Sequence, residues 1–184
     1  MSLNKIALIL MLFMLTACND LLDDLSPSSS DKRTEVVPGS LGYQVSQLAP
    51  DMSLFNTVST PVTLSAEIAT ADAVVLYFTM WCPVCDTHMS DMRSNVIPSF
   101  ASVKFYFVDY VSGTVSNARI AQVSNGYVST AFDVLVDDAN HTAVNLFNGT
   151  MGTTVVIDNT GIIQMNEDYK DGSKLITVLT ERVP

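Results

Sequence analysis

Runs of apolar residues separated by short polar turns predict strands along this chain. The strongest run covers residues 73–78, where β-branched and aromatic residues follow one another without a charged residue. Such a run is typical of a central strand that is buried on both faces. A second strong strand is predicted over 103–108. Shorter runs predict three further strands, over 62–64, 132–137 and 154–158.

Helices are predicted between these strands. The first begins at Pro83 and continues to about Ile97, where Pro98 ends it. Three more helices are predicted over 116–124, 142–147 and 173–181. Residues 159–161 predict a tight turn, after which residues 162–165 pair back as a hairpin strand. This order predicts an α/β fold in which a central mixed β-sheet is flanked by helices on both faces.

Residues 1–17 predict a targeting segment instead of part of the fold. Lys5 supplies a positive charge, and the apolar run 6–15 that follows is too short to span a bilayer. Residues 15–18 read Leu-Thr-Ala-Cys, which resembles the lipobox of bacterial lipoproteins. The resemblance implies cleavage before Cys18, which then carries the lipid. An ordinary signal peptide cut nearby, with Cys18 as an incidental thiol, is the alternative.

Residues 19–40 are rich in Ser, Asp and Pro and show no apolar period, so they predict a flexible tether. The predicted organisation is a lipoprotein signal peptide over 1–17, a lipidated cysteine with its tether over 18–40, and a folded domain over 41–184. Such a lipoprotein is expected in the bacterial cell envelope, anchored to a membrane and facing the periplasm.

Charge and cysteine content narrow the chemistry. The formal net charge of −10 argues against nucleic acid as a partner. The chain has three cysteines, and with Cys18 lipidated only Cys82 and Cys85 stay free. In an oxidising envelope, a chain without other thiols keeps this pair free of wrong partners. The pair therefore predicts thiol chemistry.

Cys82 and Cys85 follow the predicted central strand and open the helix. Pro83 suits the first helical position, where no amide donor is lost. Free N–H groups and positive potential at a helix N-terminus stabilise a thiolate and lower its pKa from about 8.5. We expect Cys82 to be the more exposed and more acidic sulfur that attacks, and Cys85 to resolve the mixed disulfide. Trp81 is expected to form an apolar contact surface for a partner.

Metal binding is the alternative use of the two thiols. Half of a zinc site would need further ligands, for which the chain offers His88 and His141 as its histidines. Soft thiolate and thioether ligands suit Cu(I). Four methionines lie near the pair or in the loop expected to face it: Met80, Met89, Met92 and Met151. A copper-binding or metallochaperone module with Cys82, Cys85 and His88 as ligands is the competing hypothesis, and an adaptor that binds through Trp81 without turnover is a third.

Four segments resemble a known family in the same order along the chain. Residues 48–54 are similar to the A-P-D-F-x-L segment of the TlpA/ResA and peroxiredoxin-like branch. Residues 78–85 resemble the F-W-A-x-W-C-x-x-C turn of thioredoxin-like proteins. Residues 132–137 and 153–161 are similar to the branch's F-P-V-L-x-D strand and P-T-T-x-x-I-D-x-x-G hairpin. The resemblance covers about residues 45–183.

The resemblance implies a thioredoxin-like fold for residues 41–184 and a thiol–disulfide oxidoreductase of the TlpA/ResA type. The partners it implies are cysteine-containing envelope proteins and a membrane electron donor or acceptor. No cofactor is expected besides the redox-active disulfide itself. Copper is expected only under the metallochaperone hypothesis. Whether the protein reduces or oxidises its partner depends on the potential of the pair, which the dipeptide Pro83-Val84 influences but does not determine.

Two positions near the cysteines differ from the family pattern. Family members carry a cis-proline just before the T-T of the hairpin, where it helps to dock the partner chain. Met151 and Gly152 stand there in this sequence, and with Trp81 and Pro83 they are the expected substrate contacts. Leu76 stands six residues before the first cysteine, where thioredoxins carry a buried Asp.

A third difference lies on the predicted helix. His88 stands three residues after Cys85, where the TlpA/ResA branch often carries Glu. At one helical turn from Cys85, an imidazole predicts a shuttle for the resolving proton near neutral pH. A helix histidine that faces solvent is the alternative.

Overall fold

The protein is described by a computed structural model that covers residues 35–128 and 131–182. The predicted signal peptide, Cys18 and most of the predicted tether lie outside the described residues. The folded unit begins at Val36. Within the described part of the chain, no helix combines the length and the apolar character that a membrane crossing requires.

Within these residues, seven strands form one mixed sheet in the order β2-β1-β5-β4-β3-β6-β7. Strand β3 lies inside the sheet, parallel to β4 and antiparallel to β6. Every residue of β3 is buried, as expected of a strand covered on both faces. The strands are β1 Ser53–Asn56, β2 Pro61–Thr63, β3 Ala73–Thr79, β4 Val103–Asp109, β5 Asp133–Val136, β6 Thr153–Asp158 and β7 Ile163–Asp168.

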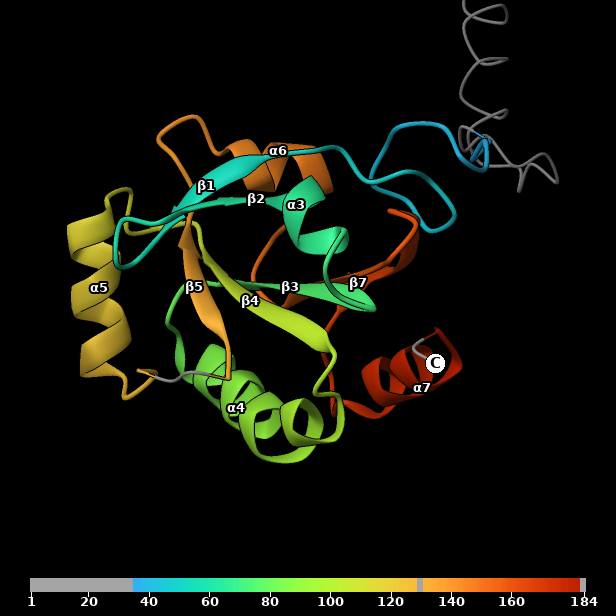
Figure 1. Cartoon of the computed structure of the whole chain (residues 1–184). Helices are drawn as coiled ribbons and strands as arrows, with labels where there is room; N and C mark the ends of the chain where they lie inside the picture. Colours follow the sequence, from blue (N-terminus) through green and yellow to red (C-terminus); the bar gives the residue numbers. More distant parts are fainter. Residues whose placement is uncertain (1–34, 129–130, 183–184) are drawn as a thin grey trace, which may run out of the picture. The chain divides into compact units, whose positions relative to one another are not determined.

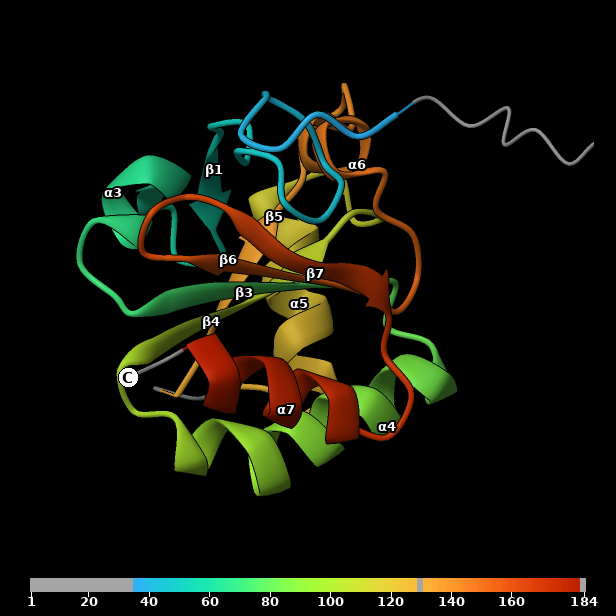
Figure 2. The same cartoon turned by 90° about the vertical axis from the view of Figure 1, so that its right-hand side faces the viewer.

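Helices cover both faces of this sheet, as the sequence predicted (Figure 1). Figure 2 shows α4 and α7 on one face and α3 and α6 on the other. The α-helices of the described residues are α3 Leu64–Ile68, α4 Pro83–Asp91, α5 Val115–Ser124, α6 Thr142–Phe147 and α7 Ser173–Arg182. The α/β class and the mixed sheet are therefore confirmed.

Strand β3 divides its side chains between two apolar clusters, because successive side chains of a strand point to opposite faces. Those packed with α4 and α7 are Ala73, Val75 and Tyr77. Those packed with α3 and α6 are Val74, Leu76 and Phe78. Burying each large side chain stabilises the fold by about 1.5–3 kcal/mol. The alternation also places the Tyr77 side chain on the face of the sheet that is covered by α4, the helix that follows the first cysteine.

Parts of the predicted element map differ from the structure. The helix expected to run to Ile97 is regular only to Asp91 and continues as a π-helical turn, η1 Met92–Val96, and a 3-10 turn, η2 Ile97–Ser99. Pro98 stands early in the 3-10 turn, where its missing N–H leaves no helical hydrogen bond unmade. The sequence pattern did not predict β1 and α3. Both are short. Strand β1 is the second strand from one edge of the sheet, and its residues are alternately exposed and buried.

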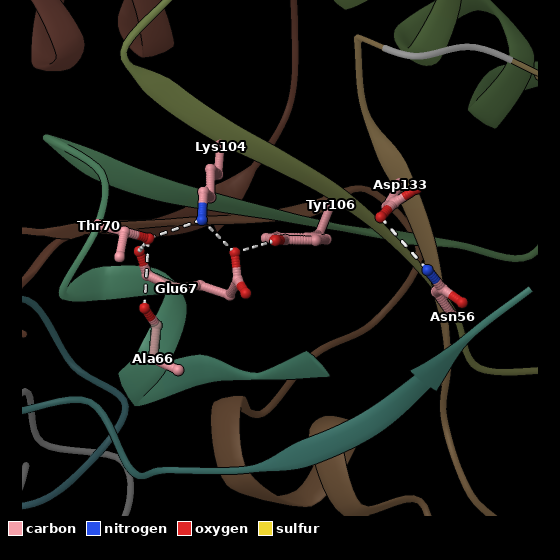
Figure 3. A network of polar contacts seen from close by, with 7 residues as sticks. All are labelled: Asn56, Ala66, Glu67, Thr70, Lys104, Tyr106 and Asp133. Carbon is pink, nitrogen blue, oxygen red and sulfur yellow. Dashed lines mark hydrogen bonds and ion pairs between the residues drawn. The ribbon is translucent and has the colours of Figure 1, made fainter. Parts of the chain in front are cut away.

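A polar network ties α3 to the sheet, away from the cysteines (Figure 3). Lys104 Nζ and the Tyr106 hydroxyl both donate to Glu67 Oε2, at 2.5 and 2.6 Å. Burial opposes ionisation of Glu67, but these hydrogen bonds outweigh it and hold the pKa of the carboxyl below its usual value. A weaker bond of 3.4 Å, from Asn56 Nδ2 to Asp133 Oδ2, joins β1 to β5. The network anchors the short helix that the sequence pattern did not reveal.

Candidate active site

The candidate site begins at the turn that joins β3 to α4. Trp81, in this turn, has a φ of 59°, which is uncommon for a residue with a β-carbon. Two hydrogen bonds hold it: its N–H donates to Thr79 Oγ1 at 3.1 Å, and its indole Nε1–H donates to Asp109 Oδ2 at 2.7 Å. Asp109 is fully buried at the end of β4. The neighbouring strand therefore fixes the turn that presents the cysteines.

Cys82 is the N-cap of α4, and Pro83 occupies the first helical position, as the sequence predicted. The Cys82 Sγ accepts a hydrogen bond from the backbone N–H of Cys85 at 3.1 Å. Both cysteines are free thiols; Cys82 is partly exposed and Cys85 is buried. Solvent and a partner chain therefore reach Cys82 and not Cys85.

The two thiols share hydrogen bonds, and this changes the expected order of acidity. Burial raises the pKa of the Cys82 thiol, and its hydrogen bond with the Cys85 thiol adds to that effect. Burial also opposes the Cys85 thiolate, but hydrogen bonds from the Cys82 thiol and from nearby backbone outweigh it. A further hydrogen bond from Thr79 helps to lower the pKa of Cys85. The donors around the buried sulfur thus favour the shared negative charge on Cys85 and do not support the expectation that Cys82 is the more acidic thiol.

Tyr77 supplies a polar group beneath Cys85. Its side chain is fully buried on β3. The hydroxyl lies 3.0 Å from His88 Nδ1, and the Cys85 thiol is a close electrostatic neighbour of it. Burial raises the pKa of Tyr77, and negative charge on Cys85 and Cys82 raises it further. The phenol therefore stays protonated while it contacts both the thiol and the imidazole.

The His88 side chain is partly exposed, and its ring packs against the buried tyrosines. Its ring centroid lies 6.0 Å from that of Tyr77, edge to face, and 5.0 Å from that of Tyr169. Burial lowers the pKa of His88, and the charges of Asp91 and Asp168 offset part of the effect. The imidazole therefore has specific side-chain partners, which a helix histidine that only faces solvent would lack. A neutral imidazole at pH 7 is free to accept a proton.

The loop that carries Met151 and Gly152 lies beside the cysteine turn. The Gly152 N–H donates to the Phe78 carbonyl at 3.0 Å, and the Met151 backbone hydrogen-bonds to Tyr110. A β-carbon built on Gly152 would lie 3.9 Å from His88 Nδ1. Gly152 has a φ of 91°, which glycine adopts readily, and the peptide bonds of the described residues are all trans. The loop thus stands where the resemblance placed it, with a different backbone geometry.

Apolar side chains are exposed in and around the cysteine turn and the facing loop. Trp81 is half-buried, with its ring 6.2 Å from that of Tyr127. Pro83 is exposed. The larger exposed side chains are Met80, Val84 and Met151. Together they offer a partner chain apolar contacts at the cysteine turn and at the loop beside it.

The structure does not bring the predicted copper ligands together. Within residues 35–128 and 131–182, no three His, Cys, Asp or Glu side chains form a group able to hold a metal ion. The Nδ1 of His88 is directed at the Tyr77 hydroxyl. Met89 and Met92 are buried in the core, where thioether side chains act as apolar filling. The donor set Cys82, Cys85 and His88 is therefore not formed.

Four residues of the site escaped the sequence analysis: Tyr77, Thr79, Asp109 and Tyr110. Each stands at or near the end of β3 or β4, where parallel strands bring their carboxyl ends together beside the helix that starts at Pro83. A usable signal was present in the sequence. Tyr77 is the one side chain with a hydroxyl in the apolar run 73–78, and Asp109 directly follows the run 103–108.

A mixed sheet with a Cys-x-x-Cys pair at the junction of a central strand and a helix defines a thioredoxin-like protein. The chain matches the AhpC/TSA family over residues 45–166, well over half of its length. It therefore belongs to the AhpC/TSA family. No curated protein matches the chain.

Solved structures share this fold. A protein of Chlorobium tepidum, described as the thiol:disulfide interchange protein DsbE, aligns with a TM-score of 0.64 and 20% identity, over 78% of this chain and 100% of that one. One from Bacteroides thetaiotaomicron, described as a protein disulfide isomerase, aligns with a TM-score of 0.63 and 22% identity, over 78% and 94%. A thioredoxin-like protein from Aeropyrum pernix gives 0.58 and 17%, over 71% and 89%. At these identities the likeness establishes the fold alone.

Proposed function

We propose that the protein is a thiol–disulfide oxidoreductase that exchanges disulfides with other proteins through Cys82 and Cys85. One observation carries the proposal: the partly exposed thiol of Cys82 caps the N-terminus of α4 and accepts a hydrogen bond from the backbone N–H of Cys85, whose own thiol is buried one turn further on. An exposed thiol can reach a partner, and the buried thiol can reach only the first. Membership of the AhpC/TSA family and the thioredoxin-like fold are consistent with this chemistry.

The exchange needs two steps. In the reducing direction, the Cys82 thiolate attacks one sulfur of a substrate disulfide, forms a mixed disulfide and releases the other substrate sulfur as a thiolate, which takes up a proton. The Cys85 thiolate then attacks the Cys82 Sγ, and the second substrate sulfur leaves. Two electrons have passed from the pair to the substrate, and Cys82 and Cys85 are joined. The oxidising direction is the reverse.

Cys82 is the exposed thiol, whereas the negative charge is favoured on Cys85. A hydrogen bond between the two thiols explains how Cys82 can still be the attacking sulfur. Loss of one proton leaves one negative charge on two sulfurs that contact each other, and the donors around Cys85 favour the charge there. Transfer of the remaining proton from Cys82 to Cys85 generates the exposed nucleophile. The backbone N–H of Cys85 donates to Cys82 Sγ at 3.1 Å and supports that form. Access, and not acidity, therefore selects Cys82 as the attacking sulfur.

The proposal includes the substrate surface and the place of action. Trp81, Pro83, Met151 and Gly152 would contact a polypeptide segment that carries the target disulfide. A lipid on Cys18 would hold the protein in the bacterial cell envelope, facing the periplasm, where it would meet cysteine-containing proteins and a membrane electron donor or acceptor. The support for the lipid is the Leu-Thr-Ala-Cys sequence over 15–18.

The test is turnover by the purified full chain in mild detergent. With dithiothreitol as electron donor, the protein should accelerate reduction of a disulfide-bonded polypeptide such as insulin. Cys82→Ser should abolish the acceleration, while the matched replacement Ser90→Ala on the same helix should leave it intact. Tight binding of Cu(I) by a chain that catalyses no exchange would instead favour the metallochaperone alternative.

A further inference from the structure

We propose that Tyr77 is a catalytic proton bridge that carries the proton of the resolving thiol, Cys85, to His88. The bridge rests on the proposed function, since it serves the second step of disulfide exchange. The geometry that carries it is a chain of three side chains from two elements: Cys85 and His88 on α4, and Tyr77 on β3 between them.

A bridge is needed because Cys85 has no direct contact with water. Its exposed fraction is 0%, so a proton leaving its sulfur must pass through a neighbouring group. The Cys82 sulfur is unavailable for this task once it is bound to the substrate in the mixed disulfide. The Tyr77 hydroxyl lies 3.0 Å from Nδ1 of the partly exposed His88, and after burial the charge of Cys85 raises the pKa of that hydroxyl most. The three side chains therefore line a route from the buried thiol to the partly exposed imidazole.

Aromatic packing holds the bridge in place. The ring of Tyr77 meets the rings of Phe107 and Tyr169 edge to face, at centroid distances of 5.8 and 6.1 Å. The Tyr169 ring also packs against His88, and its hydroxyl donates a short hydrogen bond to Asp91. The phenol and the imidazole therefore share one rigid neighbour, which keeps the distance between them suited to proton transfer.

The charges around the path favour transfer toward the imidazole. His88 is faced by Asp91 from its own helix and by Asp168 from β7, and both carboxylates stabilise an imidazolium. Tyr77 is faced by the two thiols and by Tyr169, which disfavour a phenolate. A proton therefore passes through the Tyr77 oxygen without leaving a charge on it.

The step balances as follows for atoms and electrons. The Cys85 S–H bond breaks and its proton goes to the Tyr77 oxygen, while the hydroxyl proton of Tyr77 goes to His88 Nδ1. The electron pair left on Cys85 Sγ forms the bond to Cys82 Sγ. The bond from Cys82 to the substrate sulfur breaks, and the substrate leaves as a thiolate. His88 then gives its proton to water or to that thiolate.

Single-turnover reaction of the reduced full chain with the aromatic disulfide dithionitrobenzoate separates the two steps. Attack by Cys82 releases one coloured thionitrobenzoate, and resolution by Cys85 releases the second. Tyr77→Phe removes only the hydroxyl. We expect the first release to stay within about twofold of the native rate, and the second to slow about 100-fold at pH 7.

His88→Gln should slow the second release to a similar extent, and the double variant should be no slower than either single one. In the native protein the second release should level off above the pKa of His88, whereas in Tyr77→Phe it should keep rising with pH. Tyr106→Phe, the same change in the distant network of Figure 3, is the matched control and should resolve normally.

The outcomes distinguish the bridge from the function it serves. A native second release with an unchanged pH profile in Tyr77→Phe overturns the bridge and leaves the oxidoreductase intact. A native chain that releases only one thionitrobenzoate has no resolving step, and that result overturns both. Slowing of the second release in Tyr106→Phe as large as in Tyr77→Phe would mean a general loss of structure and would also overturn the bridge.

Discussion

The indole N–H of Trp81 donates a 2.7 Å hydrogen bond to Oδ2 of Asp109, which is fully buried at the end of β4. The other carboxylate oxygen, Oδ1, accepts the backbone N–H groups of Val111 and Ser112, at 3.0 and 2.9 Å. One side chain thus organises both the cysteine turn and the chain that leaves the neighbouring strand. The geometry of the thiol pair depends on this acid as well as on its own helix.

Replacing Asp109 should therefore disturb both stability and reactivity. Asp109→Ala leaves an indole N–H and two backbone N–H groups without their acceptor, and we expect the free energy of unfolding to fall by about 1–3 kcal/mol. Urea denaturation measures this change. The rate at which Cys82 reacts with iodoacetamide should change too, because the turn loses its anchor. Native stability with a native alkylation rate in Asp109→Ala would contradict the role assigned to this residue.

Exposure of the two thiols predicts which one forms the trapped intermediate. Cys85→Ser should accumulate a mixed disulfide between Cys82 and a protein partner in cells, because the second step is blocked. Cys82→Ser should accumulate none, since Cys85 is buried. Non-reducing electrophoresis followed by mass spectrometry detects such adducts. Two results would contradict Cys82 as the attacking sulfur. One is an adduct from Cys82→Ser, and the other is faster alkylation of Cys85 than of Cys82 in the native chain.

Gly152 should tolerate neither alanine nor the proline that the family resemblance leads one to expect at this position. Its φ of 91° is strained for any residue with a β-carbon, so Gly152→Ala should destabilise the fold by about 1 kcal/mol or more. Gly152→Pro should be worse, because proline requires a φ near −65° and removes the N–H that donates to Phe78. Thermal unfolding compares the two variants. Gly126→Ala, also at positive φ but with open space around a β-carbon, is the matched control for backbone strain alone. A Gly152→Pro variant as stable as the native chain would contradict this description of the loop.

The partial burial of His88 predicts a stability that falls in mild acid. Its pKa in the folded chain is lowered from the ordinary 6.5, chiefly by burial, so the unfolded chain binds the proton more readily. Stability from this source is complete above pH 6.5 and is lost as the pH falls toward the lowered value. His88→Gln should remove that part of the pH dependence. Glu67, whose pKa lies below the ordinary 4.5, loses its stabilising effect only at lower pH. Urea denaturation between pH 5 and 7 measures this difference. If the native chain and His88→Gln show the same dependence of stability on pH, the effect assigned to the burial of His88 is contradicted.

The predicted lipid on Cys18 has a direct chemical test. Cells fed an azide-tagged fatty acid should label the native protein, and Cys18→Ala should abolish the label because the attachment site is gone. Cys82→Ser, which leaves residues 15–18 unchanged, is the matched control and should remain labelled. An unlabelled native chain would favour the ordinary signal peptide.

Elements whose sequence signal was strong could be predicted, and those defined by tertiary contacts could not. The uncharged apolar run 73–78 and the turn Trp-Cys-Pro placed β3 and the start of α4 correctly. Strand β1 and helix α3 are too short for a clear periodic signal, and tertiary contacts such as the bond from Lys104 to Glu67 hold α3 in place.

The candidate site could also be predicted only in part: the cysteine positions could be predicted, but their surroundings could not. The motif located the two thiols, but the order of their acidity depends on donors such as Thr79 that only the folded chain brings together. Tyr77 was overlooked because a tyrosine in an apolar strand resembles core filling. Its hydroxyl gains meaning only when β3 is packed against the helix that carries His88.

The redox titration of the full chain against dithiothreitol or glutathione, with metal removed, tests the central claim most directly. We predict one reversible two-electron transition for the Cys82–Cys85 pair, absent from either single serine variant. A potential near about −270 mV would indicate a reductase, and one near about −120 mV an oxidant. A chain that shows no two-electron transition under these conditions would contradict the oxidoreductase assignment.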